Sequence, residues 1–371
     1  MITKITYILK ISVYIILVAS MYIIADRKVV IKLGSNKRRT SHSLSFRFIL
    51  FFSLAFGLYT LLYAHPPYME DRRAYGFRFE RGEIYDPYFR ENSIGLFYCV
   101  KFLHLFTHNP QILFIFITFI YLYFTLLAYN EYSEAYPSTL LLLGISQYIN
   151  FSFFGLKQAP AIALSALAIG TAFTGKWILT ALLFVLATIF HESAWIVLPL
   201  LIASIGSKRT LISVLQYAAL ILVTLFFPLI SGIIASAFSV ISSLEQEIGG
   251  YFGELSYGTV NAFTWLKYIP FYFIPFYGFL MKQRLQKTVP HYRELLFISF
   301  YTAVASFMSV FMYWMWRLAM FGYFPSFVLA SILYKTMNRR KKLIFAITVF
   351  GFLGVMTLRI FAIHFFRDGG L

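Results

Sequence analysis

The sequence predicts an all-α integral membrane protein, a polytopic helical bundle of about twelve transmembrane or half-spanning helices. Of the 371 residues, 60% are hydrophobic and only 13% are charged, whereas roughly a quarter of a soluble domain is charged. Apolar runs of spanning length recur along the whole chain, and no polar stretch between them is long enough for a soluble domain. We therefore predict a single membrane domain over residues 1–371.

The first apolar run, residues 7–25, has the length of a signal peptide as well as that of a membrane helix. The residues that follow, Asp26, Arg27 and Lys28, lack a small-residue cleavage site, and a second apolar run comes next. We expect the first run to be kept as a membrane helix.

The basic residues set the predicted topology. A net charge of +17 would suggest nucleic-acid binding in a soluble protein, but here the basic residues cluster in short loops between apolar runs. Such loops are cytoplasmic by the positive-inside rule, so we expect no nucleic-acid partner. The loops at about 65–93 and 244–262, which hold much of the acid, are then outside, as are both termini. The basic clusters are Arg27, Lys28, Lys32, Lys37, Arg38, Arg39 and Arg47; Lys208 and Arg209; Lys282, Arg284, Lys287 and Arg293; and Lys335, Arg339, Arg340, Lys341 and Lys342.

Two arrangements of membrane spans in the middle of the chain keep residue 93 outside and Lys208 inside. In one, residues 94–106 span the membrane and residues 177–205 form one helix, about 43 Å long against about 30 Å of hydrocarbon. In the other, residues 94–106 form an interfacial helix, and the long run folds into two short helices that turn at residues 191–193. We favour the second, because it keeps the ionisable residues of the turn near water, where their desolvation costs less.

The predicted spans follow from that choice. Their approximate bounds are 7–25, 46–64, 111–129, 139–154, 158–174, 177–190, 192–206, 211–232, 263–281, 295–314, 316–334 and 343–366. Six polar residues then fall at or just beneath the outer face, namely Asp71, Lys157, Gln158, His191, Glu192 and Arg317.

The outside stretch 70–91 interleaves five arginines and six carboxylates with several aromatic residues. The planar donor fork of arginine suits phosphates and carboxylates, and aromatic rings offer apolar faces for stacking on sugars. The alternative is a solvated loop with surface ion pairs.

Lys157 and Gln158 directly precede an apolar run rich in small residues. The first turn of such a helix offers unpaired backbone donors and a positive dipole end, so an anionic group could lie against Lys157. The alternative for this lysine is that it snorkels to the membrane interface.

His191 and Glu192 interrupt the run 177–205, which has no other charged side chain. Ionisable residues at membrane depth are candidates for function. A histidine there could exchange a proton while Glu192 orients it. The alternative is a histidine that only hydrogen-bonds a neighbouring helix.

Arg317 lies at an outer helix end among Tyr313, Trp314 and Trp316. An aromatic belt at the interface accounts for the aromatic residues but not for a charge between two spans. Cys99 is the sole cysteine, and no Cys/His pattern has zinc-ligand spacing, so we expect neither a metal nor a cofactor.

At these residues the chain resembles the EpsG family of polytopic bacterial polysaccharide-biosynthesis proteins, which are grouped with Wzy-type polymerases of O-antigen, capsule and exopolysaccharide. The resemblance covers most of the chain. One position departs from the family pattern: Lys157 stands where arginine is usual, and lysine lacks the bidentate geometry for a diphosphate. The matching residues are Asp71 and Tyr75 after the second span, Glu91 before an aliphatic segment, Gln158 in a Gly-x-Arg-Gln signature, Phe190, His191, Ser193 and Ala194 in a Phe-His-x-Ser-Ala signature, and Arg317 before an aromatic-rich helix.

The resemblance implies a polymerase in the bacterial cytoplasmic (inner) membrane. It would transfer a growing glycan from undecaprenyl diphosphate to a new lipid-linked repeat unit at the outer face, without a metal. The implied partners are the lipid-linked glycan donor and acceptor, membrane lipid and a chain-length regulator protein. Cations would stabilise the leaving diphosphate, and Asp71 or His191 would accept the hydroxyl proton. The implied catalytic residues are Asp71, His191 and Arg317, and the implied substrate-binding residues are Arg72, Arg73, Tyr75, Glu91, Lys157, Gln158 and Glu192.

Three other classes of function share features with this sequence. A flippase or other transporter of the same lipid-linked glycans also fits many spans with few buried charges, but no internal repeat is visible and the candidate residues gather at one face. An O-acyltransferase would carry a His and Asp constellation early in the chain, and His42 and His65 lack one. An O-antigen ligase-like glycosyltransferase uses nearly the same chemistry and stays open as an alternative.

Overall fold

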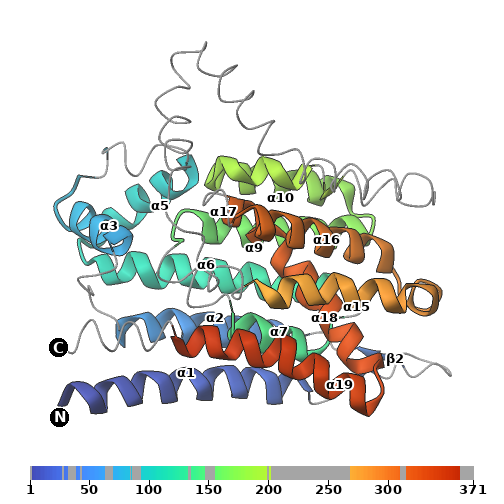
Figure 1. The fold of residues 1–371 in the computed structure, drawn as a ribbon. Coiled ribbons are helices and arrows are strands. Elements are labelled where there is room, and N and C mark those ends of the chain that lie inside the picture. Colours follow the sequence, from blue (N-terminus) through green and yellow to red (C-terminus); the bar gives the residue numbers. More distant parts are fainter. Residues whose placement is uncertain are drawn as a thin grey trace.

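The computed structural model describes residues 2–26, 29–31, 39–41, 44–62, 70–83, 85, 93–132, 135–146, 155–198, 200–201, 268–309 and 315–359. Over these residues the protein is a bundle of helices with one small hairpin, which confirms the predicted all-α class. Helices α1, α2, α6, α9 and α10 lie side by side as successive rows in Figure 1, whereas α15, α16 and α18 pack against one another and α18 packs against α7.

The elements in chain order are α1 (Ile2–Asp26), β1 (Val29–Ile31), β2 (Arg39–Ser41), α2 (Phe46–Tyr59), η1 (Thr60–Leu62), α3 (Glu70–Glu80), α5 (Ile94–His104), α6 (Pro110–Glu131), α7 (Pro137–Gly144), α9 (Gln158–Phe173), α10 (Trp177–Phe190), η2 (Glu192–Ile196), α15 (Ile269–Leu285), α16 (Tyr292–Met308), α17 (Met315–Ala319), η4 (Met320–Gly322), α18 (Tyr323–Thr336), α19 (Arg339–Phe345) and η5 (Ala346–Gly351). Strands β1 and β2 pair antiparallel within the first basic loop.

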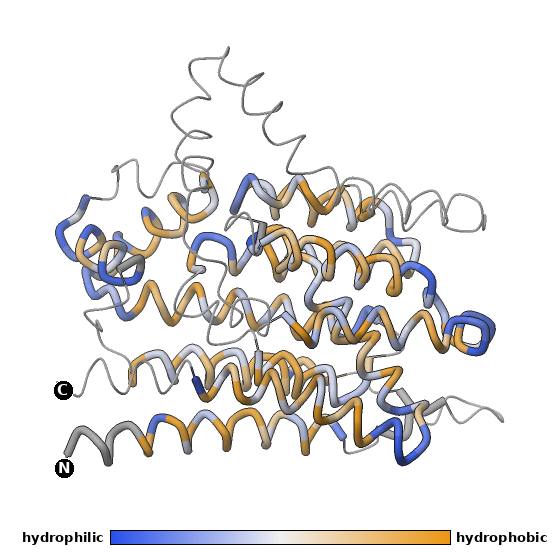
Figure 2. The backbone as a smooth tube through the Cα atoms, in the orientation of Figure 1, coloured by the Kyte–Doolittle hydropathy of each residue, from blue (hydrophilic) through white to orange (hydrophobic). Residues whose placement is uncertain are grey.

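Four helical stretches of the described chain are long and apolar enough to cross a membrane. They are Ile8–Asp26, Pro110–Glu131, Trp316–Thr336 and Arg339–Arg359. Figure 2 shows hydrophobic residues along the helices and hydrophilic residues gathered at their ends. Large side chains such as Ile178, which is 82% exposed, cover the outside of the bundle, as a lipid-facing surface requires. The protein is therefore a membrane protein, and the number of twelve spans stays a prediction.

The middle of the chain supports the second of the two topologies. Helix α10 ends at Phe190, and His191 has an extended backbone with φ −160° and ψ 126°, so residues 177–205 do not form one helix. Helix α5 has 11 residues and is about 16 Å long, too short to cross about 30 Å of hydrocarbon.

Helix α3 corrects one expectation, because the stretch 70–91 was predicted as a loop and residues Glu70–Glu80 are helical. Four residues on one side of α3 are buried, at the i, i+3, i+4 and i+7 spacing of a helix face. They are Arg72, Tyr75, Gly76 and Phe79. This face packs on α6 and holds α3 against the bundle.

Helix α9 lies at the centre and is buried along almost its whole length. Its small residues allow close packing: a Cβ atom at Gly170 would lie 2.8 Å from the Tyr132 ring. The Tyr132 hydroxyl also donates to the Ala166 carbonyl (3.1 Å). These contacts fix α9 against α6, and so fix the position of the polar residues at its first turn.

Candidate active site

The candidate site is built around the turn that ends α10. His191 Nδ1 accepts hydrogen bonds from the Ser193 backbone N–H (3.1 Å) and the Ser193 hydroxyl (2.8 Å). Gln158, the first residue of α9, donates its Nε2–H to the same hydroxyl oxygen (3.4 Å). Because a backbone N–H can only donate, Nδ1 carries no proton, and the proton of the neutral imidazole is on Nε2.

Two cations act on this histidine. His191 lies in the turn after α10, outside the helical spans, and its pKa is lowered from 6.5 to about 4. The cause is first burial and then the positive charges of Arg317 and Lys157. Lys157 in turn lies with its Nζ 5.9 Å from the centre of the Tyr75 ring.

These residues come from segments far apart in the sequence. In Figure 1 helix α17 lies beside the ends of α9 and α10, and contacts join η2 to both α9 and α17. Helix α5 completes the arrangement, because the Ser93 hydroxyl donates to the Phe190 carbonyl (2.9 Å). The structure therefore gathers five of the predicted site residues at one end of the bundle: Tyr75, Lys157, Gln158, His191 and Arg317.

The two arginines at the start of α3 have different surroundings. Arg72 is fully buried, and its Nη2 donates to the Thr60 carbonyl (3.1 Å) and to Gln111 Oε1 (3.5 Å). Its guanidinium also lies 4.1 Å from the centre of the Phe114 ring. Arg72 thus fastens α3 to η1 and α6, whereas Arg73 is exposed.

Three predicted site residues remain to be described, namely Glu192, Asp71 and Glu91. Glu192 is exposed on η2. Asp71 lies in α3, but its side chain is outside the described part of the chain, as is the whole of Glu91. The predicted span 211–232 and the predicted loop 244–262 also lie outside the described residues.

Ser193 is the residue that sequence reasoning left without a role. Its signal is its position two residues after a histidine that ends a helix, which lets the histidine cap the next helical turn. In the structure this serine occupies Nδ1 of His191 and leaves the proton of the neutral ring on Nε2.

Comparison with known protein families gives one result that decides the identity. The model of the EpsG family matches residues 46–368. The chain belongs to the EpsG family. Members of this family are membrane proteins similar to Wzy-type polysaccharide polymerases, so the coarse function is a polymerase-like, glycosyltransferase-type role in polysaccharide biosynthesis. Comparison with curated proteins and with solved structures finds no match.

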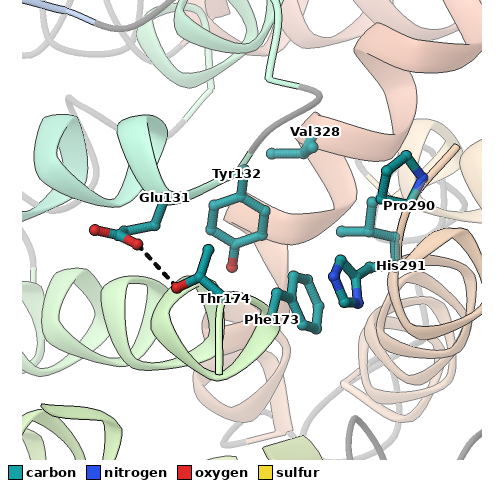
Figure 3. A pocket seen from close by; sticks show the side chains of 8 residues that line it. Glu131, Tyr132, Phe173, Thr174, Pro290, His291 and Val328 are labelled. Atoms are coloured by element: carbon teal, nitrogen blue, oxygen red, sulfur yellow. Dashed lines mark hydrogen bonds between the residues drawn. The ribbon is translucent and has the colours of Figure 1, made fainter. Parts of the chain in front are cut away.

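The EpsG-family protein has a pocket at the end of α9 opposite to the candidate site, shown in Figure 3. Its lining contains none of the predicted site residues. Glu131 at its edge pairs with Lys176 (2.7 Å) and accepts from the Thr174 hydroxyl (3.1 Å). Its lining residues are Glu131, Tyr132, Phe173, Thr174, Pro290, His291, Leu295 and Val328.

Proposed function

We propose that this EpsG-family protein is a polymerase of lipid-linked oligosaccharide repeat units in O-antigen, capsule or exopolysaccharide synthesis. It transfers the growing glycan from undecaprenyl diphosphate to a new repeat unit, at the outer face of the bacterial cytoplasmic membrane. The observation that carries the proposal is the gathering of Arg317 and Lys157 around the partly buried His191. The reaction releases a diphosphate, and preorganised cations in a water-poor site stabilise the charge that develops on it.

The reaction needs few groups. A hydroxyl oxygen of the acceptor sugar attacks the anomeric carbon of the growing chain, and the bond from that carbon to the diphosphate oxygen breaks. The diphosphate leaves with the bonding electron pair, and the hydroxyl proton passes to a base. The site must therefore supply cations on the leaving side and a base on the attacking side.

Arg317 and Lys157 serve the leaving side. Lys157 precedes α9, so the backbone donors of the first turn and the positive end of the helix dipole add to its charge. Lysine binds phosphate as a point charge rather than bidentately, which leaves Arg317 as the residue for paired hydrogen bonds to the diphosphate.

His191 acts in this proposal as a neutral hydrogen-bond donor rather than as the base. Its Nδ1 is occupied by Ser193, and its lowered pKa keeps the ring neutral at physiological pH. The Nε2–H is then available to a sugar hydroxyl or to a diphosphate oxygen. Of the two candidate bases, Asp71 and His191, this leaves Asp71 to accept the proton of the attacking hydroxyl.

The first test is gel analysis of surface polysaccharide in a deletion strain that carries wild type, Arg317→Ala or the control Arg340→Ala. Arg340 is exposed at the opposite end of the bundle, at the start of α19. We expect wild type and Arg340→Ala to restore a ladder, and Arg317→Ala to leave single repeat units with normal amounts of protein in the membrane. Ladders of wild-type length in Arg317→Ala would remove this residue from the site.

The same experiment separates a polymerase from a flippase. Loss of all surface glycan in the deletion strain, with repeat units trapped on the cytoplasmic face, would contradict the polymerase and favour transport. Ladders that persist on the lipid carrier but fail to reach the final acceptor would instead indicate a ligase.

A further inference from the structure

Two histidines lie close together outside the candidate active site. His104 ends α5, and His108 lies in the connection to α6. His108 Nδ1 is 2.9 Å from His104 Nε2, and the ring planes are inclined by 89°. Helix α5 begins beside the candidate site, where Ser93 bonds to Phe190, and His104 is about 15 Å further along the helix.

The ring of His104 is held from the side of α3. It lies edge-on against Phe79, with 5.4 Å between ring centres. In the hydrogen bond between the two rings one nitrogen donates and the other accepts, so a lone pair of one ring already points at the other ring. A lone pair on a ring nitrogen is what a metal ion binds.

We propose that His104 and His108 form a two-histidine binding site for a divalent transition metal such as Zn²⁺ or Ni²⁺. Imidazole nitrogen suits both ions. Zn–N bonds of about 2.0–2.1 Å in tetrahedral geometry place two ligating nitrogens about 3.3 Å apart. The observed 2.9 Å separation therefore needs to open by only a few tenths of an ångström, with the metal replacing the proton between the rings.

The pair is open to solvent, because the contact between the two ring nitrogens is exposed and His108 lies at the surface. No third His, Cys, Asp or Glu side chain joins the pair within the described residues, so water fills the remaining coordination positions. A bound ion would link the end of α5 to the connection into α6, close to the end of α3.

The site is tested by metal titration of the whole protein in detergent, purified through a tag without histidine and stripped with a chelator. Calorimetry with Ni²⁺ or Zn²⁺ should show one saturable site per chain. We expect His104→Ala and His108→Ala each to weaken binding at least tenfold, and the double variant to abolish it. The control is His291→Ala, an exposed histidine stacked on Phe173, which should bind as wild type does.

Two results would overturn the proposal. One is the absence of saturable binding to wild type, and the other is unchanged binding in the double variant. Because His108 is exposed in a connection, its substitution leaves the helices intact, and size-exclusion profiles of the variants check this. A second readout is heat stability, which Ni²⁺ should raise in wild type and leave unchanged in the double variant. Chain extension is not used as a readout, so failure of this site leaves the proposed polymerase untouched.

Discussion

At the residue scale, the chemistry of His191 is set by its neighbour Ser193. The two hydrogen bonds to Nδ1 leave Nε2–H as the reactive edge, which makes this histidine a donor. The side-chain amide of glutamine can replace histidine as a hydrogen-bond donor, but it cannot replace histidine as a base. We therefore expect His191→Gln to keep a measurable rate of chain extension and His191→Ala to lose about 100-fold or more. Equal loss in both variants, measured with lipid-linked repeat units in detergent, would return His191 to the role of base.

The lowered pKa of His191 predicts a pH dependence of stability. The folded-state pKa of about 4 lies below the ordinary value of 6.5, so the unfolded chain binds the proton first as pH falls. The contribution of neutral His191 to the free energy of unfolding is fully present above pH 6.5 and is lost as pH falls towards 4. Between pH 7.5 and 5 we expect Tm to fall by about 2 °C more in wild type than in His191→Gln. Identical falls in thermal melts of the two proteins would contradict this.

Residues also show what sequence could not predict. Lys157, Gln158, His191 and Arg317 are recognisable because charged or polar groups are conspicuous in apolar surroundings. The hydrogen bonds of Ser193 cannot be recognised from the sequence, because they depend on the rotamer of the side chain and on the backbone conformation of the turn. The burial of Arg72 was also missed, because an arginine is expected at the surface until its partners on other helices are known.

At the element scale, α9 carries the geometry of the site, because its packing on α6 fixes Lys157 and Gln158. A Cβ atom at Gly170 would lie 2.8 Å from the Tyr132 ring and 2.9 Å from Glu131 Cβ, closer than real contacts allow. We expect Gly170→Ala to destabilise the protein by about 1–3 kcal/mol, measured by thermal unfolding in detergent. The control Gly354→Ala, where a Cβ atom meets nothing within 4 Å, should be neutral or slightly stabilising. Equal effects of the two substitutions would contradict the close packing.

The two elements hardest to read from sequence were α10 and α3. The end of α10 at Phe190 was predicted from two arguments: one helix over residues 177–205 would outgrow the bilayer, and a turn keeps His191 and Glu192 near water. Helix α3 was missed because two of its four buried positions are Arg72 and Gly76, so its inner face does not form an apolar stripe. Hydrophobic periodicity predicts helices whose buried face is apolar. The buried face of α3 contains the charged side chain of Arg72, so periodicity does not detect this helix.

At the scale of the whole molecule, the proposal requires that the candidate site faces outward and the basic loops face the cytoplasm. Glu192 is exposed on η2 beside His191, and Arg340 is exposed at the other end of the bundle. In a Cys99→Ser background, we expect Glu192→Cys to react with a membrane-impermeant maleimide on intact cells. Arg340→Cys should react only after the cells are opened.

This labelling experiment tests the topology independently of catalysis. The predicted orientation of the protein in the membrane rests on the basic loops, which we expect in the cytoplasm. The turn at His191 is then expected on the outer side. Modification of residue 192 only after the cells are opened would place the cations of the site on the side where lipid-linked repeat units are made. A site there could not extend glycans at the outer face, so the same result would refute the outer-face polymerase even if the Arg317→Ala variant were inactive.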